Sequence, residues 1–361
     1  MRGRTILGLL LFRGRRARWD YEARVSEDLQ FDQRLLQRVE DGVPLVREPY
    51  AELARQLNCG ESTVLDRLRE LRGDGGVVRE VSAIFDLPRL GYAQSLVALA
   101  VDAGGLDAGG RIVADHPGVS HCYARDDEWD LWFTLAVSPA SRLGLEGTVD
   151  RLAGRCGTRK RMILPTLRRY KLHVRLAASA APPNEPPAPP RDEKRPPLEL
   201  SDAQRRAVRA LQLDLPNRSD PFAPLAKQAN LPADELLVHA ADLLAAGAMR
   251  RYAAVLRHHR AGYPANVLVV WKVGETAADA AGAICAQQPA VSHCYLRPAS
   301  ERWPYALYTM IHGRSRQDCE MTVEELLAKT GLREHRQLWT TREFKKQRVR
   351  LFDDEEATWE G

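Results

Sequence analysis

The sequence of 361 residues has few cysteines and no hydrophobic run long enough to cross a membrane. Its six cysteines are scattered and none belongs to a CxxC pair, which argues against a structural zinc site and a disulfide-rich fold, and favours reduced thiols. The only long apolar run near the N-terminus, Ile6–Phe12, is too short to span a bilayer, and no small-residue cleavage site follows it. We therefore expect a cytoplasmic protein without a membrane segment.

The body of the chain has no surplus of charge of either sign. Lys plus Arg number 53 and Asp plus Glu number 48, which gives a net charge of +5. Residues 1–24 carry seven Arg against Asp20 and Glu22, so this segment alone accounts for the whole surplus. The remaining residues are balanced and exert no net attraction on phosphate, which argues against a strongly DNA-binding body. We interpret residues 1–27 as a basic flexible tail.

The chain is an internal duplication. The segment Gly118–Arg125 recurs as Ala290–Arg297 at an offset of 172, and Pro49–Ala54 recurs as Pro221–Ala226 at the same offset. Between the copies lies Ala177–Pro197, which contains eight prolines and cannot bury a core. The sequence therefore predicts two homologous halves joined by an extended tether, and we expect the two halves to pair with each other.

Each half predicts the same order of elements. Three amphipathic helices followed by an alternating strand, Val77–Phe85 in the first half, are typical of a winged helix-turn-helix. A βαββαβ pattern follows and is typical of a ferredoxin-like unit. In the first half it comprises strands Gln94–Val101, Val119–Ala124, Trp129–Val137 and Arg161–Leu167, with helices Arg111–His116 and Ser141–Leu152. The sequence thus predicts an α+β fold with two tandem copies of a winged helix-turn-helix plus a ferredoxin-like βαββαβ unit.

The domain boundaries follow from these patterns. We predict a basic tail at 1–27, winged helix-turn-helix units at 28–85 and 198–256, ferredoxin-like domains at 86–176 and 257–352, a Pro-rich linker at 177–197 and an acidic tail at 353–361.

Neither copy of the helix-turn-helix has a reading helix well suited to DNA. The first, Glu61–Glu70, mixes Arg67 and Arg69 with three acidic side chains. The second, Asp234–Ala245, has three acidic side chains and no Lys or Arg, so it would meet phosphates with repulsion alone. We expect the helix-turn-helix to be a packing module and the protein not to bind specific DNA.

The second half gains cations and imidazoles that the first half lacks. When the copies are aligned on shared glycines, Arg250 matches an Arg of the first half, whereas Arg251, His258 and His259 have no basic counterpart. Strand alternation would place Arg250 and Tyr252 on one face and Arg251 on the other. A solvated charged edge is one interpretation. The other is a partly closed polyanion site, where imidazole serves as proton donor or metal ligand.

One strand in each half carries a polar triplet on a single face. The residues are His121, Tyr123 and Arg125 in the first half, and His293, Tyr295 and Arg297 in the second. Three such side chains in line on a sheet face are poor core material. A lone His is usually a satisfied core residue, but the recurrence of the whole triplet favours a binding or catalytic site.

Aromatic residues follow each triplet directly. They are Trp129, Trp132 and Phe133 in the first half, and Trp303, Tyr305 and Tyr308 in the second, with His312 close behind. An aromatic wall beside Arg and His fits a pocket for a flat, anionic ligand with an apolar body. Plain core packing explains each aromatic residue equally well.

The motifs resemble those of a known family. The layout is similar to that of the Lrp/AsnC regulators, and specific phrases resemble one branch of them, the siroheme decarboxylases. In the first half these phrases are Ala83–Asp86, Leu90–Tyr92, His116–Tyr123 and Asp130–Thr134; in the second they are Arg250–Tyr252, His258–Tyr263, Val291–Tyr295, Trp303–Tyr305 and Thr341–Lys346. The chain looks like a natural fusion of the two subunits that this branch uses in heme d1 biosynthesis.

The resemblance implies a carboxy-lyase that removes two acetate carboxyls from siroheme and yields 12,18-didecarboxysiroheme. The expected catalytic residues are His258, His259, His293 and Tyr295. The expected substrate-binding residues are Arg250, Arg251, Arg297, Trp303, His312, His121, Tyr123 and Arg125. No metal site and no organic cofactor is expected, because the iron belongs to the substrate, and the second half is expected to carry the principal site.

A regulator is the alternative function. An Lrp/AsnC-type transcription factor that responds to heme or a metabolite would have the same layout, but the acidic second reading helix favours the lyase. The sequence does not show in which order the two carboxyls leave, nor which histidine is a proton donor and which an iron ligand. It is compatible with a homo-oligomer.

Overall fold

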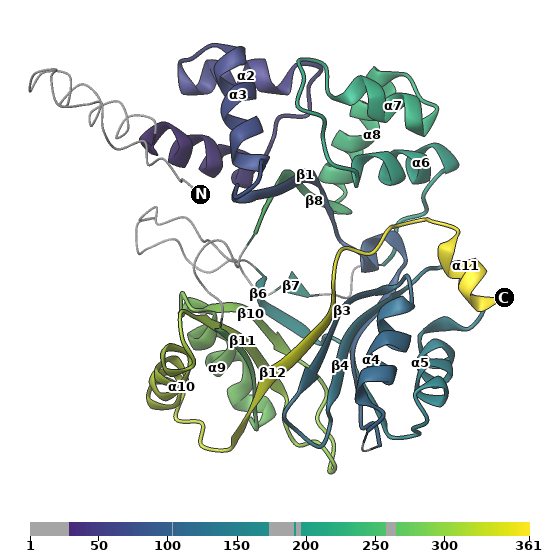
Figure 1. The fold of residues 1–361 in the computed structure, drawn as a ribbon, viewed down its shortest axis with the longest axis vertical. Helices are drawn as coiled ribbons and strands as arrows, with labels where there is room; N and C mark the ends of the chain where they lie inside the picture. Colours follow the sequence, from purple (N-terminus) through teal and green to yellow (C-terminus); the bar gives the residue numbers. More distant parts are fainter. Residues whose placement is uncertain (1–28, 103, 173–190, 193–195, 258–264) are drawn as a thin grey trace, which may run out of the picture.

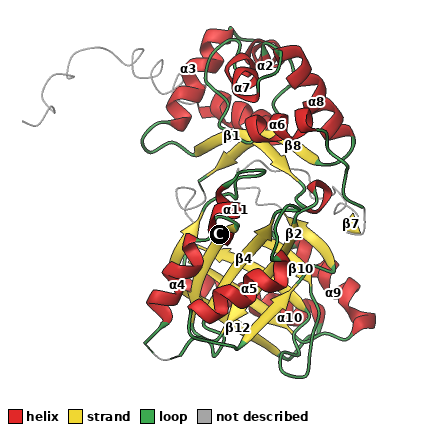
Figure 2. Ribbon diagram, turned by 90° about the vertical axis from the view of Figure 1, so that its right-hand side faces the viewer, coloured by secondary structure: helices red, strands yellow, loops and turns green. Residues whose placement is uncertain are grey.

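The duplicated chain folds into a helical lobe above a β-rich lobe (Figures 1 and 2). The computed structural model describes residues 29–102, 104–172, 191–192, 196–257 and 265–361. The two halves contribute to both lobes, so the lobes do not correspond to the halves of the sequence.

The upper lobe joins the two predicted winged helix-turn-helix units. Its elements are a helix at 29–41, α2 (Pro49–Leu57), α3 (Glu61–Arg72) and β1 (Val78–Phe85) from the first half, and α6 (Asp202–Leu211), α7 (Phe222–Ala229), α8 (Ala233–Ala245) and β8 (Met249–Leu256) from the second. Strand β1 pairs antiparallel with β8, and one hydrophobic core, which includes Tyr50, Leu68, Phe222 and Leu236, runs through both units. The units therefore form one packed body.

The lower lobe contains the two predicted ferredoxin-like units. The first consists of β2 (Ala93–Leu99), α4 (Leu106–Asp115), β3 (Val119–Arg125), β4 (Leu131–Val137), α5 (Gly144–Arg155) and β5 (Arg161–Leu164). The second consists of β9 (Ala265–Trp271), α9 (Glu275–Gln287), β10 (Val291–Leu296), β11 (Leu307–Gly313), α10 (Arg316–Thr330) and β12 (His335–Lys346). This order confirms the predicted fold class.

The two units exchange their final strands. The N-terminal part of β12 pairs with β9 of its own half, and its C-terminal part crosses to β3 of the first half. In the first half the predicted strand Arg161–Leu167 ends earlier, at Leu164, and Pro165, which lacks an N–H, follows. The chain resumes as β6 (Arg168–Leu172), which pairs with β10 of the second half. The result is a ten-stranded sheet in the order β5-β2-β4-β3-β12-β9-β11-β10-β6-β7, where β7 is Arg191–Asp192.

Each exchanged strand is anchored in the same way. The ring of Phe344 in β12 lies against Gly110 of α4, and the ring of Tyr170 in β6 lies against Gly282 of α9. The neighbouring Lys345 donates from Nζ to the carbonyl of His116 at 2.8 Å, just beyond the end of α4. Because an aromatic ring sits where a Cβ would be, each helix needs glycine at that point. The halves pair with each other, as the sequence predicted.

The inner sheet face forms a core shared by the two units. Trp132 of the first half and Trp303 of the second lie with ring centroids 5.6 Å apart, and the Trp303 indole N–H donates to the Tyr308 hydroxyl at 2.7 Å. Trp132, Trp303 and Tyr308 are each only 1% exposed. For these three residues the structure supports core packing.

The C-terminal residues return to the first half. Within 353–361, predicted as an acidic tail, helix α11 (Glu355–Glu360) lies beside α5 (Figure 1). The Glu356 carboxylate accepts the N–H of Ser138 at 2.9 Å, and Glu360 accepts that of Arg142 at 3.0 Å. All six cysteines are free thiols.

Candidate active site

In the second half, His293 and Tyr295 lie on one face of β10, and Arg297 follows directly after the strand. The His293 and Tyr295 ring centroids are 6.0 Å apart, and the Arg297 guanidinium carbon is 5.1 Å from the Tyr295 ring centroid. The first half repeats this arrangement on β3, with 6.2 Å between the rings of His121 and Tyr123. The alternation predicted from the sequence therefore brings each triplet together.

The two arginines of the triplets reach across to the opposite half. Arg125 donates from Nη1 to the carbonyl of Leu338 in β12 at 2.8 Å, and Arg297 donates from Nη1 to the carbonyl of Leu164 in β5. Arg125 is 4% exposed, and burial lowers its pKa to about 10. Both guanidiniums thus connect the two halves by hydrogen bonds. The sequence analysis did not predict this structural role. Their part in substrate binding stays a prediction.

A serine connects two histidines of the second half. Ser292 Oγ lies 2.7 Å from His293 Nδ1 and 3.0 Å from His312 Nε2. In the first half the equivalent serine meets one imidazole, because the strand register places Ala136 where the second half has His312. The second half alone therefore couples two imidazoles through one hydroxyl. Ser292 was missed, although the Ser-His pair stands in both copies.

A β-bulge overturns the predicted faces of β8. In its pairing with β1, Ile84 faces Arg251 and Phe85 faces Met249, so Arg250 is the extra residue. The expectation that Arg250 shares a face with Tyr252 and not with Arg251 was wrong, because a bulge inserts one residue and breaks the alternation. Tyr252 packs into the helical core, with its ring 5.4 Å from that of Phe222.

Arg250 and its neighbours form a buried charge cluster. Asp86 Oδ2 accepts from Arg250 Nη2 at 2.9 Å and Nε at 3.1 Å, and it lies 3.8 Å from Nη2 of Arg169. Burial lowers the pKa of Arg250, and the charge of Arg169 adds to this effect. Asp86 and Arg169 belong to the first half, and no pattern along the chain indicates that they meet Arg250.

A second basic cluster lies near the triplet of the first half. Burial lowers the pKa of Arg348, and the positive charges of Arg79 and Arg251 lower it further. Arg348 Nε lies 3.2 Å from Glu80 Oε1. Burial lowers the pKa of the His121 imidazole to about 4, and the positive charges of Lys346 and Arg79 contribute to this shift. Arg251 and His121 thus lie near the same group of basic side chains.

The two adjacent histidines cannot be placed. His258 and His259 lie outside the described residues, which stop at Arg257 and resume at Ala265. Their catalytic role stays a prediction. Trp303, expected to bind substrate, is buried in the shared core, and its role toward substrate also stays a prediction.

Comparison with known proteins gives a direct match to both kinds of domain. The model of the AsnC-like ligand binding domain matches residues 89–171 and 260–345, and the siroheme decarboxylase NirDL-like HTH domain matches residues 32–79. A siroheme decarboxylase of Hydrogenobacter thermophilus is 34% identical over 330 residues, which cover 91% of this chain and 97% of that protein. The chain belongs to the siroheme decarboxylase family.

Two further members of the siroheme decarboxylase family bear on the architecture. The crystal structure of the siroheme decarboxylase NirDL with an iron-uroporphyrin III analogue is 31% identical, with a TM-score of 0.74 over 90% of this chain and 96% of that one. The siroheme decarboxylase beta subunit of Desulfovibrio desulfuricans is 37% identical over 155 residues, 43% of this chain and 98% of the subunit. One half of this chain thus corresponds to the whole of that beta subunit.

The arginines of the first reading helix, α3, pair with other groups of this siroheme decarboxylase family member. In α3, Arg67 donates to Asp32 at 2.8 Å, Arg69 to Asp66 at 2.5 Å, and Arg72 to the carbonyl of Leu215 at 2.8 Å. The cations that could contact phosphate are therefore already paired with protein groups. This favours the packing role, and the absence of specific DNA binding stays a prediction.

The described residues of this family member contain no cluster of metal-ligating side chains and no membrane-spanning helix. There, no three side chains of His, Cys, Asp or Glu cluster as metal ligands would. None of the helices described is both long and apolar enough to cross a membrane.

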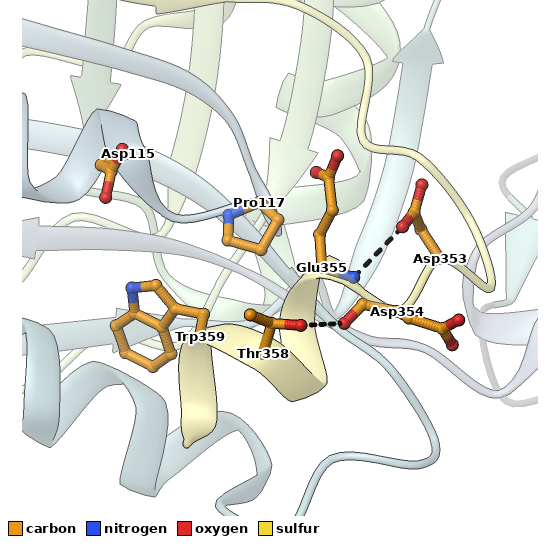
Figure 3. Close-up of a pocket in the computed structure, with 7 residues that line it drawn as sticks. All are labelled: Asp115, Pro117, Asp353, Asp354, Glu355, Thr358 and Trp359. Carbon is orange, nitrogen blue, oxygen red and sulfur yellow. Dashed lines mark hydrogen bonds between the residues drawn. The ribbon is translucent and has the colours of Figure 1, made fainter.

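An open pocket of about 460 Å³ lies between α11 and the end of α4 (Figure 3). Four carboxylates line it, those of Asp115, Asp353, Asp354 and Glu355. A carboxylate-rich tetrapyrrole, the ligand type of the siroheme decarboxylase family, would be repelled there. The triplet of the second half stays the predicted active site.

Proposed function

We propose that the protein is a carboxy-lyase that removes two acetate carboxyls from siroheme and yields 12,18-didecarboxysiroheme in heme d1 biosynthesis. The observation that carries the proposal is the similarity to a siroheme decarboxylase over 97% of that protein's length, through both halves. A structure of a relative with an iron-uroporphyrin III analogue supports a tetrapyrrole as ligand. The iron belongs to the substrate, so we propose no separate cofactor. The free thiols support a reducing compartment, and we place the reaction in the cytoplasm.

The proposed decarboxylation sets three requirements for the site. The bond between the acetate methylene and its carboxyl carbon breaks, the electron pair passes into the macrocycle, CO2 leaves, and a proton reaches the methylene carbon to form a methyl group. The macrocycle must therefore be protonated or polarised as an electron sink, the reacting carboxylate must be kept from water, and the remaining carboxylates must be held.

The second half offers groups for two of these requirements, the binding of carboxylates and the supply of a proton. Arg250 suits carboxylate recognition, because a guanidinium donates in a fixed fork. The pair His293 and His312, coupled by Ser292, can hold and pass a proton, and Tyr295 lies 6.0 Å from His293, ring to ring. We therefore propose that this half carries the principal site, together with His258 and His259.

The decisive experiment is an anaerobic incubation of the purified protein with siroheme, followed by mass spectrometry of the tetrapyrrole. We expect a mass lower by two CO2 units, with heat-inactivated protein as the control. An unchanged tetrapyrrole together with a specific DNA gel shift would favour the regulator instead.

A further inference from the structure

We infer that Ser292 is a positioning residue for the proposed decarboxylation: its hydroxyl sets which nitrogen of His293 carries the proton, and it passes protons to His293 from His312. The inference rests on the proposed function, since it assigns a task to a further residue of the predicted active site. All three residues lie in the described part of the chain.

A β-bulge directs the Ser292 side chain toward both imidazoles. In the pairing of β10 with β11 the register shifts between Val291 and His293, so Ser292 is the extra residue. Regular alternation turns neighbouring side chains to opposite faces, whereas a bulge re-aims a side chain. Ser292 Oγ therefore lies 2.7 Å from Nδ1 of the adjacent His293, and 3.0 Å from Nε2 of His312 in β11.

The Ser292 hydroxyl has more partners than protons. Besides the two imidazoles it contacts the carbonyl of Met310 at 3.2 Å, and Ser292 is only 2% exposed. A hydroxyl carries one proton and a carbonyl can only accept, so the hydroxyl donates either to Met310 or to one imidazole. When it donates to His293 Nδ1, the proton of a neutral His293 lies on Nε2. When it donates to Met310, His293 Nδ1 must itself donate to the hydroxyl, so rotation of one O–H bond switches the tautomer of His293.

These contacts support a proton path from His312 to the substrate. As CO2 leaves, the acetate methylene carbon takes a proton from Nε2 of His293. The hydroxyl proton of Ser292 moves to His293 Nδ1, and the Nε2 proton of a protonated His312 moves to Ser292 Oγ. His293 and His312 both end neutral and Ser292 keeps its hydroxyl, so one proton is used for each carboxyl lost. His312 takes its next proton from solvent.

The first half has the same bulge but not the second imidazole. The register of β3 shifts at Ser120, whose Oγ lies 3.0 Å from His121 Nδ1. Ala136 donates its backbone N–H across the strand pair at the point where His312 does so in the second half. An alanine side chain has no proton to give. The bulge and its serine are therefore common to both halves, and the proton source differs between them.

The test compares Ser292→Ala with Ser120→Ala in the full-length protein. Each variant removes one hydroxyl from a bulge next to a histidine. Loss of carboxyls from siroheme is followed anaerobically by mass spectrometry, and dissociation constants for iron-uroporphyrin III are measured by absorbance titration. We expect Ser292→Ala to lower kcat by about 10- to 100-fold, below the roughly 10²–10⁴ that a lost acid–base group costs, with little change in the dissociation constant. Ser120→Ala is expected to react like the parent.

A double-mutant cycle separates proton transfer from packing. Because Ser292 and His312 act in series, the variant with both Ser292→Ala and His312→Ala should lose no more kcat than the slower single variant. Independent packing effects would multiply instead. Ser292→Thr, which keeps a hydroxyl, should recover part of the lost kcat. Multiplied losses, or an effect of Ser292→Ala on the dissociation constant alone, would overturn the inference.

The outcomes also distinguish this inference from the proposed function. If the parent protein decarboxylates siroheme and Ser292→Ala does so at the same rate, the inference is wrong and the function stands. If the parent leaves siroheme intact under the same conditions, both are wrong. Thermal unfolding identifies any variant that fails to fold. Ser292→Cys, whose thiol is a weaker hydrogen-bond partner, then takes the place of Ser292→Ala in the comparison.

Discussion

Replacement of Gly110 by alanine should weaken the joint between the halves. Gly110 lies within α4, and three ring atoms of Phe344 approach the place of its missing Cβ to under 3.0 Å. Real Cβ atoms essentially never show such contacts. The ring comes from β12, the strand that the second half inserts beside β3, so a methyl group at Gly110 would push against the exchanged strand.

The expected magnitude follows from two opposing effects. In a helix interior, alanine is favoured over glycine by about 0.8–1 kcal/mol. An extra methyl group in a filled site typically costs about 1–3 kcal/mol, because side chains and backbone must shift. The net change expected for Gly110→Ala is a loss of about 1 kcal/mol, measured as a lower unfolding midpoint in urea.

Gly154 provides a matched control. It also lies in a helix of the first half, α5, but among the described residues no atom outside its own stretch of helix stands within 4 Å of its would-be Cβ. Gly154→Ala should therefore stabilise the protein by up to about 1 kcal/mol. Phe344→Leu in the Gly110→Ala background should relieve the overlap and recover stability. The reasoning is refuted if Gly110→Ala is as stable as Gly154→Ala, or if Phe344→Leu lowers stability equally in both backgrounds.

Four further predictions concern catalysis, pH, DNA and the pairing of the halves. Single substitutions of His258 or His259 by Ala should lower turnover by roughly 10²–10⁴, and near-normal rates in both single variants and the double variant would remove them from the mechanism. Burial and the positive charge of Lys345 lower the pKa of the fully buried His116 to about 4. Because the unfolded imidazole titrates near 6.5, the free energy of unfolding is highest above that pH and should fall by about 3 kcal/mol as the pH drops toward 4. The variant His116→Gln should lose less stability over the same pH range, as measured by urea unfolding. Deletion of residues 1–24 should abolish any retention on DNA at moderate salt, and a footprint on a defined operator by the shortened protein would contradict this. The halves expressed as separate chains should associate and regain siroheme turnover, whereas full activity of the isolated second half would show that the first is only a scaffold.

Local patterns were sufficient for the fold class and the triplets. The repeat of Gly118–Arg125 as Ala290–Arg297 revealed the duplication, and helical and strand periodicity placed the elements of each half. Alternation put His293 and Tyr295 on one face, as the structure confirms. These features succeed because periodicity is a property of consecutive residues and needs no knowledge of distant partners.

Features that depend on partners far along the chain were decided by the tertiary structure. The bulge at Arg250 arises only from the pairing of β8 with β1, so counting along the strand assigned the wrong faces. The place of Arg169 beside Tyr295 follows from the exchange of β6, which pairs strands more than 120 residues apart in sequence. Patterns along the chain indicated most of the strands, though not β6 or β7, and showed which side chains share a face of a regular strand. Only the folded chain decided which strands are neighbours, because hydrogen bonds between strands carry no signature within either segment.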